Sequence, residues 1–348
     1  MKNTIIKEID STNIDVEAIE LYAGMIKDGK TVIFPTETVY GLGANALDES
    51  AAMNIYSAKG RPSDNPLIVH ICDMNGLEEI ASGISDKARL IIDNFWPGPI
   101  TLIFSKKSCV PYATTGGLET VAVRMPSHPV ARELIRLSGV PIAAPSANIS
   151  GKPSPTRQEH IICDMDGRVD GIILGGACDV GLESTVIDIR GEVPVVLRPG
   201  GITTEQLEDL VGRVDIDPAL EMPDENITPM SPGMKYKHYS PDAQVYVVSG
   251  EKDALAEKIN GLCIKNRDEG LKTGVICMKE DIPAYRGCEI LSLGISMEDA
   301  ANNLFDALIE MDKRKVDIVY AQSFEETGIG KAIMNRLLKS AGYRIINA

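Results

Sequence analysis

Six segments of this sequence combine basic side chains with Ser, Thr or Asn inside loops rich in glycine and proline. They are "KGRPSDN" (59–65), "TVAVRMPSHP" (120–129), "APSANISGKPSPT" (144–156), "LEST" (182–185), "LRPGGIT" (197–203) and "SPGMKYKHY" (231–239). Arginine pairs bidentately with carboxylates and phosphates, and loop N–H and hydroxyl groups complete an anion shell. Each segment alone is compatible with a structural turn. Together they favour a site for a nucleoside triphosphate and a small carboxylate substrate.

The first of these segments continues as "KGRPSDNPLIVH", which ends at His70. Its first half is polar and stiffened by two prolines, and its second half reads as a short strand. We expect Arg61 and Lys59 to hold phosphate and His70 to reach a substrate at the end of the strand. The alternatives are a surface loop with solvated charges and a structural histidine at a strand end.

Two glycine-rich motifs have simpler interpretations. "GLGANA" (41–46) formally fits a dinucleotide-binding fingerprint, but it lacks a strand directly before it and an acidic partner about twenty residues later. We therefore expect a tight turn that uses Gly41 and Gly43. "GIGKA" (328–332) lacks the first glycine and the Ser/Thr of a phosphate loop, so we expect the start of a helix there. No nucleophile elbow is present, which disfavours covalent hydrolase chemistry.

Composition restricts the class of protein. The chain has 348 residues and a formal net charge of −15, with seven scattered cysteines and no Cys-x-x-Cys. This argues against a disulfide framework and a structural zinc site. A pI near 4.8 speaks against a broad nucleic-acid-binding face but not against a local basic site. We find no run of 18 apolar residues and no signal-like apolar region at the N-terminus, so we expect a cytoplasmic protein without a membrane contact.

The elements that must position these residues form two α/β blocks. Up to residue 212 we expect a substantial mixed sheet flanked by helices. Its helices are expected at 16–28, 50–58, 85–95, 129–138, 156–164 and 203–210, and its strands at 31–34, 67–71, 100–104, 120–124, 140–144, 171–174, 184–189 and 193–197. A proline-rich connector follows at 213–241. Residues 242–348 alternate strands and helices, which predicts a small, doubly wound, Rossmann-like domain.

The motif set resembles the L-threonylcarbamoyladenylate synthase family, whose catalytic domain is called YrdC-like. The resemblance rests on "PTETVYGLGANA", "KGRPSDNPLIVH", "WPGPITLIF", "VAVRMPSHP", "PSANISGKPSPT", "STVID" and "LRPG", in that order over roughly residues 15–210. "SPGMKYKHYSP" and the α/β segment after it resemble the longer, two-domain form. The same domain occurs in carbamoyl-transferring hydrogenase maturation proteins, but their additional modules are absent here.

The resemblance implies a nucleotidyltransferase. It would join L-threonine, bicarbonate and ATP into L-threonylcarbamoyl-AMP and release pyrophosphate. A separate tRNA threonylcarbamoyl transferase complex would then use the product for N6-threonylcarbamoyladenosine modification of tRNA. Because the substrate is itself the nucleophile, no catalytic Ser, Cys or tightly bound metal is required, and magnesium would arrive with ATP.

Site residues follow from the same resemblance. It implies that Lys59 and Arg61 are catalytic. ATP would contact Arg61, Asn65, Thr120, Ser146, Ser154, Arg198 and Tyr236. L-Threonine would contact Thr38, His70, Arg124, Ala144 and Ser184. The residue types fit these roles, since Arg124 suits an amino-acid carboxylate, and Thr38 and Ser184 suit a hydroxyl or amine.

Two further alternatives remain open at this point. A protein of the same fold could be a binding module for double-stranded RNA, although the acidic composition disfavours it, and a weak RNA contact is left open. In the connector, "SPGMKYKHYSP" (231–241) is expected to fold over the nucleotide as a lid rather than act as a passive tether. Lys235 and Lys237 would then face phosphates, and Tyr236 or Tyr239 would pack on ATP or on the domain wall.

Overall fold

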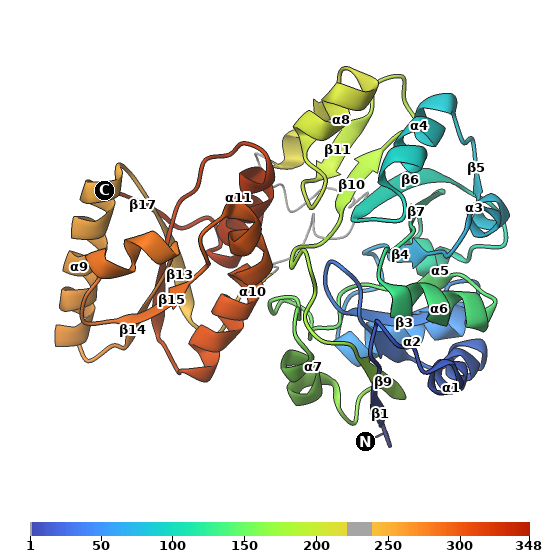
Figure 1. Ribbon diagram of the computed structural model, residues 1–348, viewed down its shortest axis with the longest axis horizontal. Helices are drawn as coiled ribbons and strands as arrows, with labels where there is room; N and C mark the ends of the chain where they lie inside the picture. Colours follow the sequence, from blue (N-terminus) through green and yellow to red (C-terminus); the bar gives the residue numbers. More distant parts are fainter. Residues whose placement is uncertain (1, 221–238) are drawn as a thin grey trace. The chain divides into compact units, whose positions relative to one another are not determined.

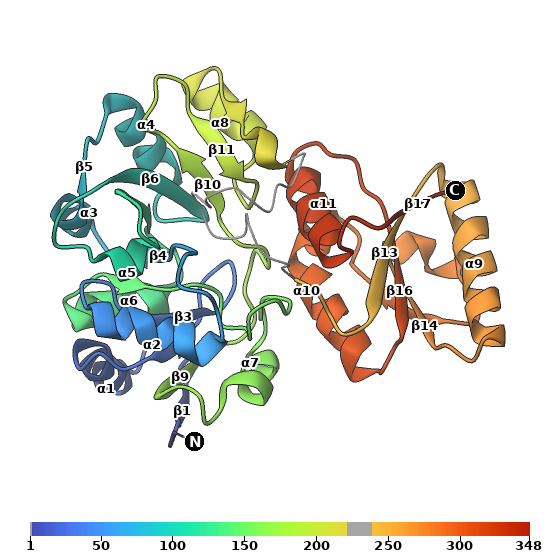
Figure 2. The same ribbon diagram turned by 180° about the vertical axis from the view of Figure 1, so that it is seen from behind.

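The computed structural model describes residues 2–220 and 239–348, and they form two α/β units. The described part of the first unit comprises residues 2–150 and 155–220. That of the second comprises residues 151–154 and 239–348. Figures 1 and 2 show both units from opposite sides. No helix of the described residues is long and apolar enough to cross a membrane.

A mixed 12-stranded sheet forms the first unit and confirms the predicted fold class. Its strands, in spatial order, are β1 (Ile5–Glu8), β9 (Gly171–Leu174), β2 (Val32–Phe34), β3 (Gly41–Asn45), β8 (Ile142–Ala143), β4 (Ile68–His70), β7 (Thr120–Arg124), β6 (Ile100–Lys106), β10 (Thr185–Asp188), β11 (Val195–Arg198) and β12 (Asp215–Ile216), with β5 (Ala81–Ser82) beside β6. Strand β12 lies within residues 213–241, where the connector was expected.

Helices pack on this sheet through amphipathic faces. They are α1 (Val16–Lys27), α2 (Glu49–Lys59), α3 (Met74–Ile80), α4 (Asp86–Phe95), α5 (Tyr112–Thr115), α6 (Pro129–Ser138), α7 (Gln158–Met165) and α8 (Thr204–Val211). Their ends follow local sequence signals. Asp15 accepts a hydrogen bond from the Ala18 N–H at the start of α1, and Thr203 and Gln206 form a capping box at the start of α8.

The tight turn expected at 41–46 is wrong, because strand β3 occupies these residues. Neither Gly41 nor Gly43 has a positive φ. A Cβ on Gly43 would lie 2.6 Å from the Phe34 ring and 2.7 Å from a methyl of Ile142. A glycine is therefore required at position 43 because the Phe34 and Ile142 side chains leave no room for a Cβ, and not because of turn geometry. Local sequence does not reveal this distinction.

The second unit has a five-stranded parallel sheet in the order β15-β14-β16-β13-β17. Its elements are β13 (Gln244–Ser249), α9 (Lys252–Asp268), β14 (Thr273–Cys277), the 3₁₀ turn η2 (Lys279–Ala284), β15 (Glu289–Ser292), α10 (Met297–Lys313), β16 (Ile318–Gln322), α11 (Ile329–Ser340) and β17 (Ile345–Asn347). Helix α9 covers one face, and α10 and α11 cover the other (Figures 1 and 2). The predicted Rossmann-like character and the helix start at 328–332 are confirmed.

Candidate active site

One edge of the mixed sheet gathers the predicted threonine-site residues. His70 and Arg124 end the parallel strands β4 and β7 and lie directly opposite each other in register. Strand β6 runs antiparallel to β7, and β10 runs parallel to β6. Thr101 near the start of β6 and Ser184 just before β10 therefore reach the same edge as the ends of β4 and β7.

Arg124 is the centre of a buried network at this edge. Its Nη1 donates to Thr38 Oγ1 at 2.8 Å and its Nε to the Gly98 carbonyl at 3.3 Å. Its Nη2 lies 2.7 Å from Glu37 Oε1, and both side chains are about 95% buried. Thr38 also shares a hydrogen bond of 2.9 Å with Thr36. The guanidinium is thus fixed in position by the protein before any carboxylate substrate arrives.

Burial and charge set the protonation of this network. Burial acts to raise the pKa of Glu37, but the Arg124 charge and hydrogen bond outweigh it and hold the pKa below its ordinary value. Burial, with the Arg124 charge, lowers the pKa of His70 to about 3. His70 is therefore neutral at physiological pH. Its Nδ1 is buried and has no hydrogen-bond partner among the described residues.

A second arginine organises the neighbouring corner. Arg198, at the end of β11, donates from Nε and Nη2 to the Ser184 carbonyl at 3.1 and 3.0 Å. Its Nη2 also donates to Ser184 Oγ at 3.2 Å. Ser184 Oγ and Thr101 Oγ1 lie 2.8 Å apart. The structure therefore joins one predicted ATP residue and one predicted threonine residue directly.

Lys59, the last residue of α2, holds a loop that follows β8. Its buried amine donates to the Ser146 and Asn148 carbonyls and to Asn148 Oδ1. Burial, with the nearby Arg61 charge, lowers the pKa of Lys59 well below its ordinary value. The three contacts use the three donors of an ammonium group. In this geometry Lys59 is a positioning residue for the loop that carries Ser146.

The loop between α2 and β4 presents a buried amide without partners. Arg61 Nη2 donates to the Asn65 and Pro66 carbonyls at 3.3 and 3.2 Å. Asn65 is fully buried, and neither its Oδ1 nor its Nδ2 has a hydrogen-bond partner among the described residues. Such groups are rare in folded proteins, because burying an amide without a partner is costly. The amide is thus available to hydrogen-bond to a polar ligand.

The other predicted residues lie at varied positions. Ala144 donates its N–H to the Ile68 carbonyl, so a substrate would meet only its carbonyl oxygen. Thr120 begins β7, about 13 Å along the strand from Arg124. Ser154 is buried and belongs to a segment that groups with the second unit. Tyr236, predicted to contact ATP, lies outside the described residues.

The predicted lid falls largely outside the described residues as well. This applies to Lys235 and Lys237. Tyr239 is described, and its buried ring packs on Phe305 of α10, with ring centroids 5.1 Å apart.

Three residues of the site were not found from the sequence: Glu37, Thr101 and Asn148. Glu37 is the one carboxylate of "PTETVYG", and only the structure shows that it is buried. Its partner Arg124 is remote along the chain, so the pairing cannot be predicted from local sequence. Thr101 looks like an ordinary strand residue, and Asn148 looks like a turn residue.

The chain is similar to known proteins over nearly its whole length. A family model described as "Telomere recombination" matches residues 24–200, and one described as "Threonylcarbamoyl-AMP synthase, C-terminal domain" matches residues 202–342. The threonylcarbamoyl-AMP synthase of Pyrococcus abyssi is 51% identical over 94% of this chain and 95% of its own length. That of Bacillus subtilis is 47% identical over 99% of both chains.

A solved structure extends the likeness to three dimensions. The crystal structure of P. abyssi Sua5 complexed with L-threonine is 50% identical and has a TM-score of 0.95. It covers 99% of this chain and 100% of its own. The predicted family is therefore confirmed: the chain belongs to the threonylcarbamoyl-AMP synthase family.

Proposed function

We propose that this protein is a nucleotidyltransferase that makes L-threonylcarbamoyl-AMP from L-threonine, bicarbonate and ATP. The threonine amine and bicarbonate form a carbamate and release water. A carbamate oxygen then attacks the α-phosphorus of ATP, and pyrophosphate leaves. The proposal draws on the full-length relatives of this name and on the L-threonine complex of P. abyssi Sua5. Catalysis of this type depends on positioning and charge stabilisation.

The preformed Arg124 network is the observation that supports binding of L-threonine. Its guanidinium has N–H groups beyond those bound to Glu37, Thr38 and Gly98, and these suit the substrate carboxylate. Neutral His70 offers a ring nitrogen at the same edge. Ser184 and the Ala144 carbonyl would meet the remaining polar groups of threonine.

In this proposal, the loops after α2 and β8 bind ATP. Arg61, Arg198 and Ser146 would contact the phosphates, and the unpartnered Asn65 amide would bind ATP directly. Lys59 would act by holding the Ser146 loop. Thr120 and Ser154 remain predictions for the rest of the nucleotide. Magnesium would enter bound to ATP, and the product would pass to a tRNA threonylcarbamoyl transferase complex.

ATP–pyrophosphate exchange tests this function. With the full-length protein and radiolabelled pyrophosphate, we expect label to enter ATP only when L-threonine and bicarbonate are both present. Mass spectrometry should detect threonylcarbamoyl-AMP in the same mixture. Leaving out either substrate is the matched control. Exchange without threonine, or no exchange under any condition, would overturn the assignment.

A further inference from the structure

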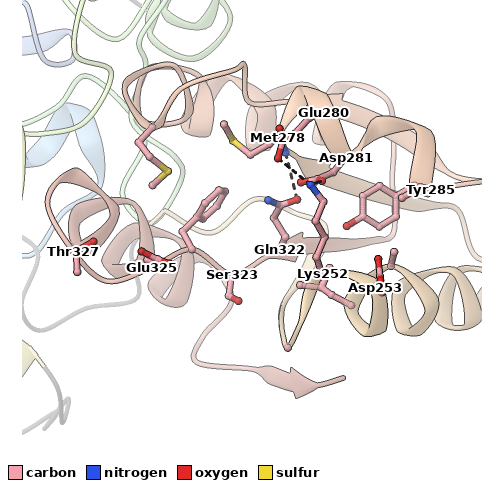
Figure 3. Close-up of a pocket in the computed structure, with 16 residues that line it drawn as sticks. Lys252, Asp253, Met278, Glu280, Asp281, Tyr285, Gln322, Ser323, Glu325 and Thr327 are labelled. Carbon is pink, nitrogen blue, oxygen red and sulfur yellow. Dashed lines mark hydrogen bonds and ion pairs between the residues drawn. The ribbon is translucent and has the colours of Figure 1, made fainter.

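A cavity in the second unit is lined by none of the residues of the candidate active site. It has a volume of about 500 Å³ and is lined by the segments that follow β13, β14 and β16 (Figure 3). From β13 the chain continues toward β14, on one side of β13, and from β16 it crosses to β17 on the other side. Ligands of open parallel sheets bind at such switch points, beyond the carboxyl ends of the strands. The volume is in the range of small-molecule sites.

The cavity does not suit a phosphate. Its one lysine, Lys252, lies 2.6 Å from Asp281 Oδ1 and 2.9 Å from Glu280 Oε1. Hydrogen bonds to these two carboxylates raise the pKa of Lys252. Its exposed ammonium group is thus already paired with two carboxylates of the same unit, and no other basic side chain lines the cavity in the described part of the chain. Asp253 adds a negative charge in the first turn of α9, where an anion would otherwise bind.

Two carboxylates of the lining are available to a cation. Asp253 follows β13 and Glu325 follows β16, and both residues are exposed. Neither has an ion-pair partner among the described residues. Figure 3 shows them well apart, with Ser323 and Lys252 between them. A ligand that satisfied both would need positive charges at separate points.

The wall between these carboxylates combines apolar side chains with a tyrosine hydroxyl. Phe324, Met278 and Met297 supply apolar surface. Tyr285 is 6% exposed, and its hydroxyl makes no hydrogen bond to any residue that the structure describes. In Figure 3 this hydroxyl points toward Lys252, into the cavity. The hydroxyl oxygen is open to the cavity, so a ligand that carries a hydrogen-bonding group at that point can pair with it.

We propose that this cavity binds a small aliphatic polyamine. Its terminal ammonium groups would pair with Asp253 and Glu325, and its methylene chain would lie along Phe324. An inner amine would hydrogen-bond to the Tyr285 hydroxyl. The site is distinct from the proposed synthase site and does not depend on that function.

Calorimetry with spermidine as the probe tests the proposal on the full-length protein, without ATP and at physiological ionic strength. We expect saturable binding that weakens at least tenfold in Asp253→Asn/Glu325→Gln. Tyr285→Phe should weaken it severalfold while keeping the ring. The matched control is Glu257→Gln/Glu269→Gln, which removes the same charge from exposed positions of the same unit outside the cavity and should bind normally.

Methionine methyl NMR locates the ligand independently. Spermidine should shift the methyl signals of Met278 and Met297 but leave those of Met25 and Met165, which lie in the core of the first unit. Equal loss of binding in the control variant would identify nonspecific attraction to an acidic protein and overturn the proposal. So would the absence of binding, or tighter binding of inorganic phosphate that shifts the same methyl groups. Circular dichroism confirms that each variant is folded.

Discussion

The buried amide of Asn65 is a residue whose proposed ATP contact and whose effect on stability can be tested together. Both of its polar side-chain atoms lack partners among the described residues, although the side chain is fully buried. An unsatisfied buried polar group costs about 1–3 kcal/mol. If ATP binds to Asn65 as proposed, its hydrogen bonds to the amide would relieve that cost.

We therefore expect Asn65→Leu, which has similar volume, to raise the stability of the ligand-free protein by ~1–3 kcal/mol. The same change should weaken ATP binding at least tenfold and leave threonine binding within twofold. Urea unfolding is followed by fluorescence of Trp96, the single tryptophan of the chain, which reports on the first unit. A variant that is less stable and binds ATP normally would show that the amide has a structural role.

The buried ion pair of Arg124 and Glu37 supports a second prediction at this scale. Arg124→Ala should abolish measurable threonine binding and also destabilise the protein by about 3–5 kcal/mol, because it leaves Glu37 charged and buried. Adding Glu37→Gln should restore most of the stability without restoring threonine binding. Calorimetry and urea unfolding separate the two effects. A double variant with normal threonine affinity would refute the assignment of Arg124 to the carboxylate.

At the scale of elements, the strands bring the loops together, and a glycine leaves room for large side chains of the neighbouring strands. Strand β3 lies between β2 and β8 and directly follows the loop that carries Glu37 and Thr38. Gly43 faces Phe34 and Ile142 with no room for a side chain. The position of the loop that carries Glu37 and Thr38 depends on this contact.

Gly43→Ala should destabilise the first unit by ~1–3 kcal/mol, because its methyl group would overlap two packed side chains. The matched control is Gly24→Ala in the middle of α1, where no atom lies within 4 Å of the added Cβ. That change should stabilise the unit by up to about 1 kcal/mol, through helix propensity. Urea unfolding with Trp96 fluorescence measures both. Equal effects of the two substitutions would contradict this account of β3.

At the scale of the whole molecule, the buried titratable groups make stability depend on pH. His70 has a folded pKa of about 3 against an ordinary value of 6.5. Between these values the unfolded chain binds a proton that the folded protein does not, so stability falls as pH falls. Glu37 acts in the same direction, since its lowered pKa contributes stability that is lost as pH drops through the folded value.

We expect wild-type protein to lose ~2 kcal/mol more than His70→Gln between pH 6.5 and pH 5, at about 1.4 kcal/mol per pH unit. Urea unfolding of both proteins at several pH values, again with Trp96 fluorescence, gives this difference. Above pH 7 the gap between the two proteins should be constant. Parallel losses in acid would show that His70 is not held neutral by burial.

The sequence by itself determined the class of fold, the position of most elements and the family. Caps such as Asp15 and Thr203 act within one helical turn, and alternating strands and helices encode the parallel sheet of the second unit. The ordered motifs were specific enough to indicate threonylcarbamoyl-AMP synthesis. These signals are readable because each depends on residues close together in the chain.

Only the tertiary structure decided which groups meet. Arg124 binds Thr38 across 86 positions, and Lys59 holds Asn148 across 89. The close packing of Gly43 depends on Phe34 and Ile142, from other strands. Burial, partners and cavities arise from strands that are adjacent in the sheet but distant in sequence. The motifs and the family resemblance therefore indicated candidate site residues but not their pairing, their protonation or the second cavity.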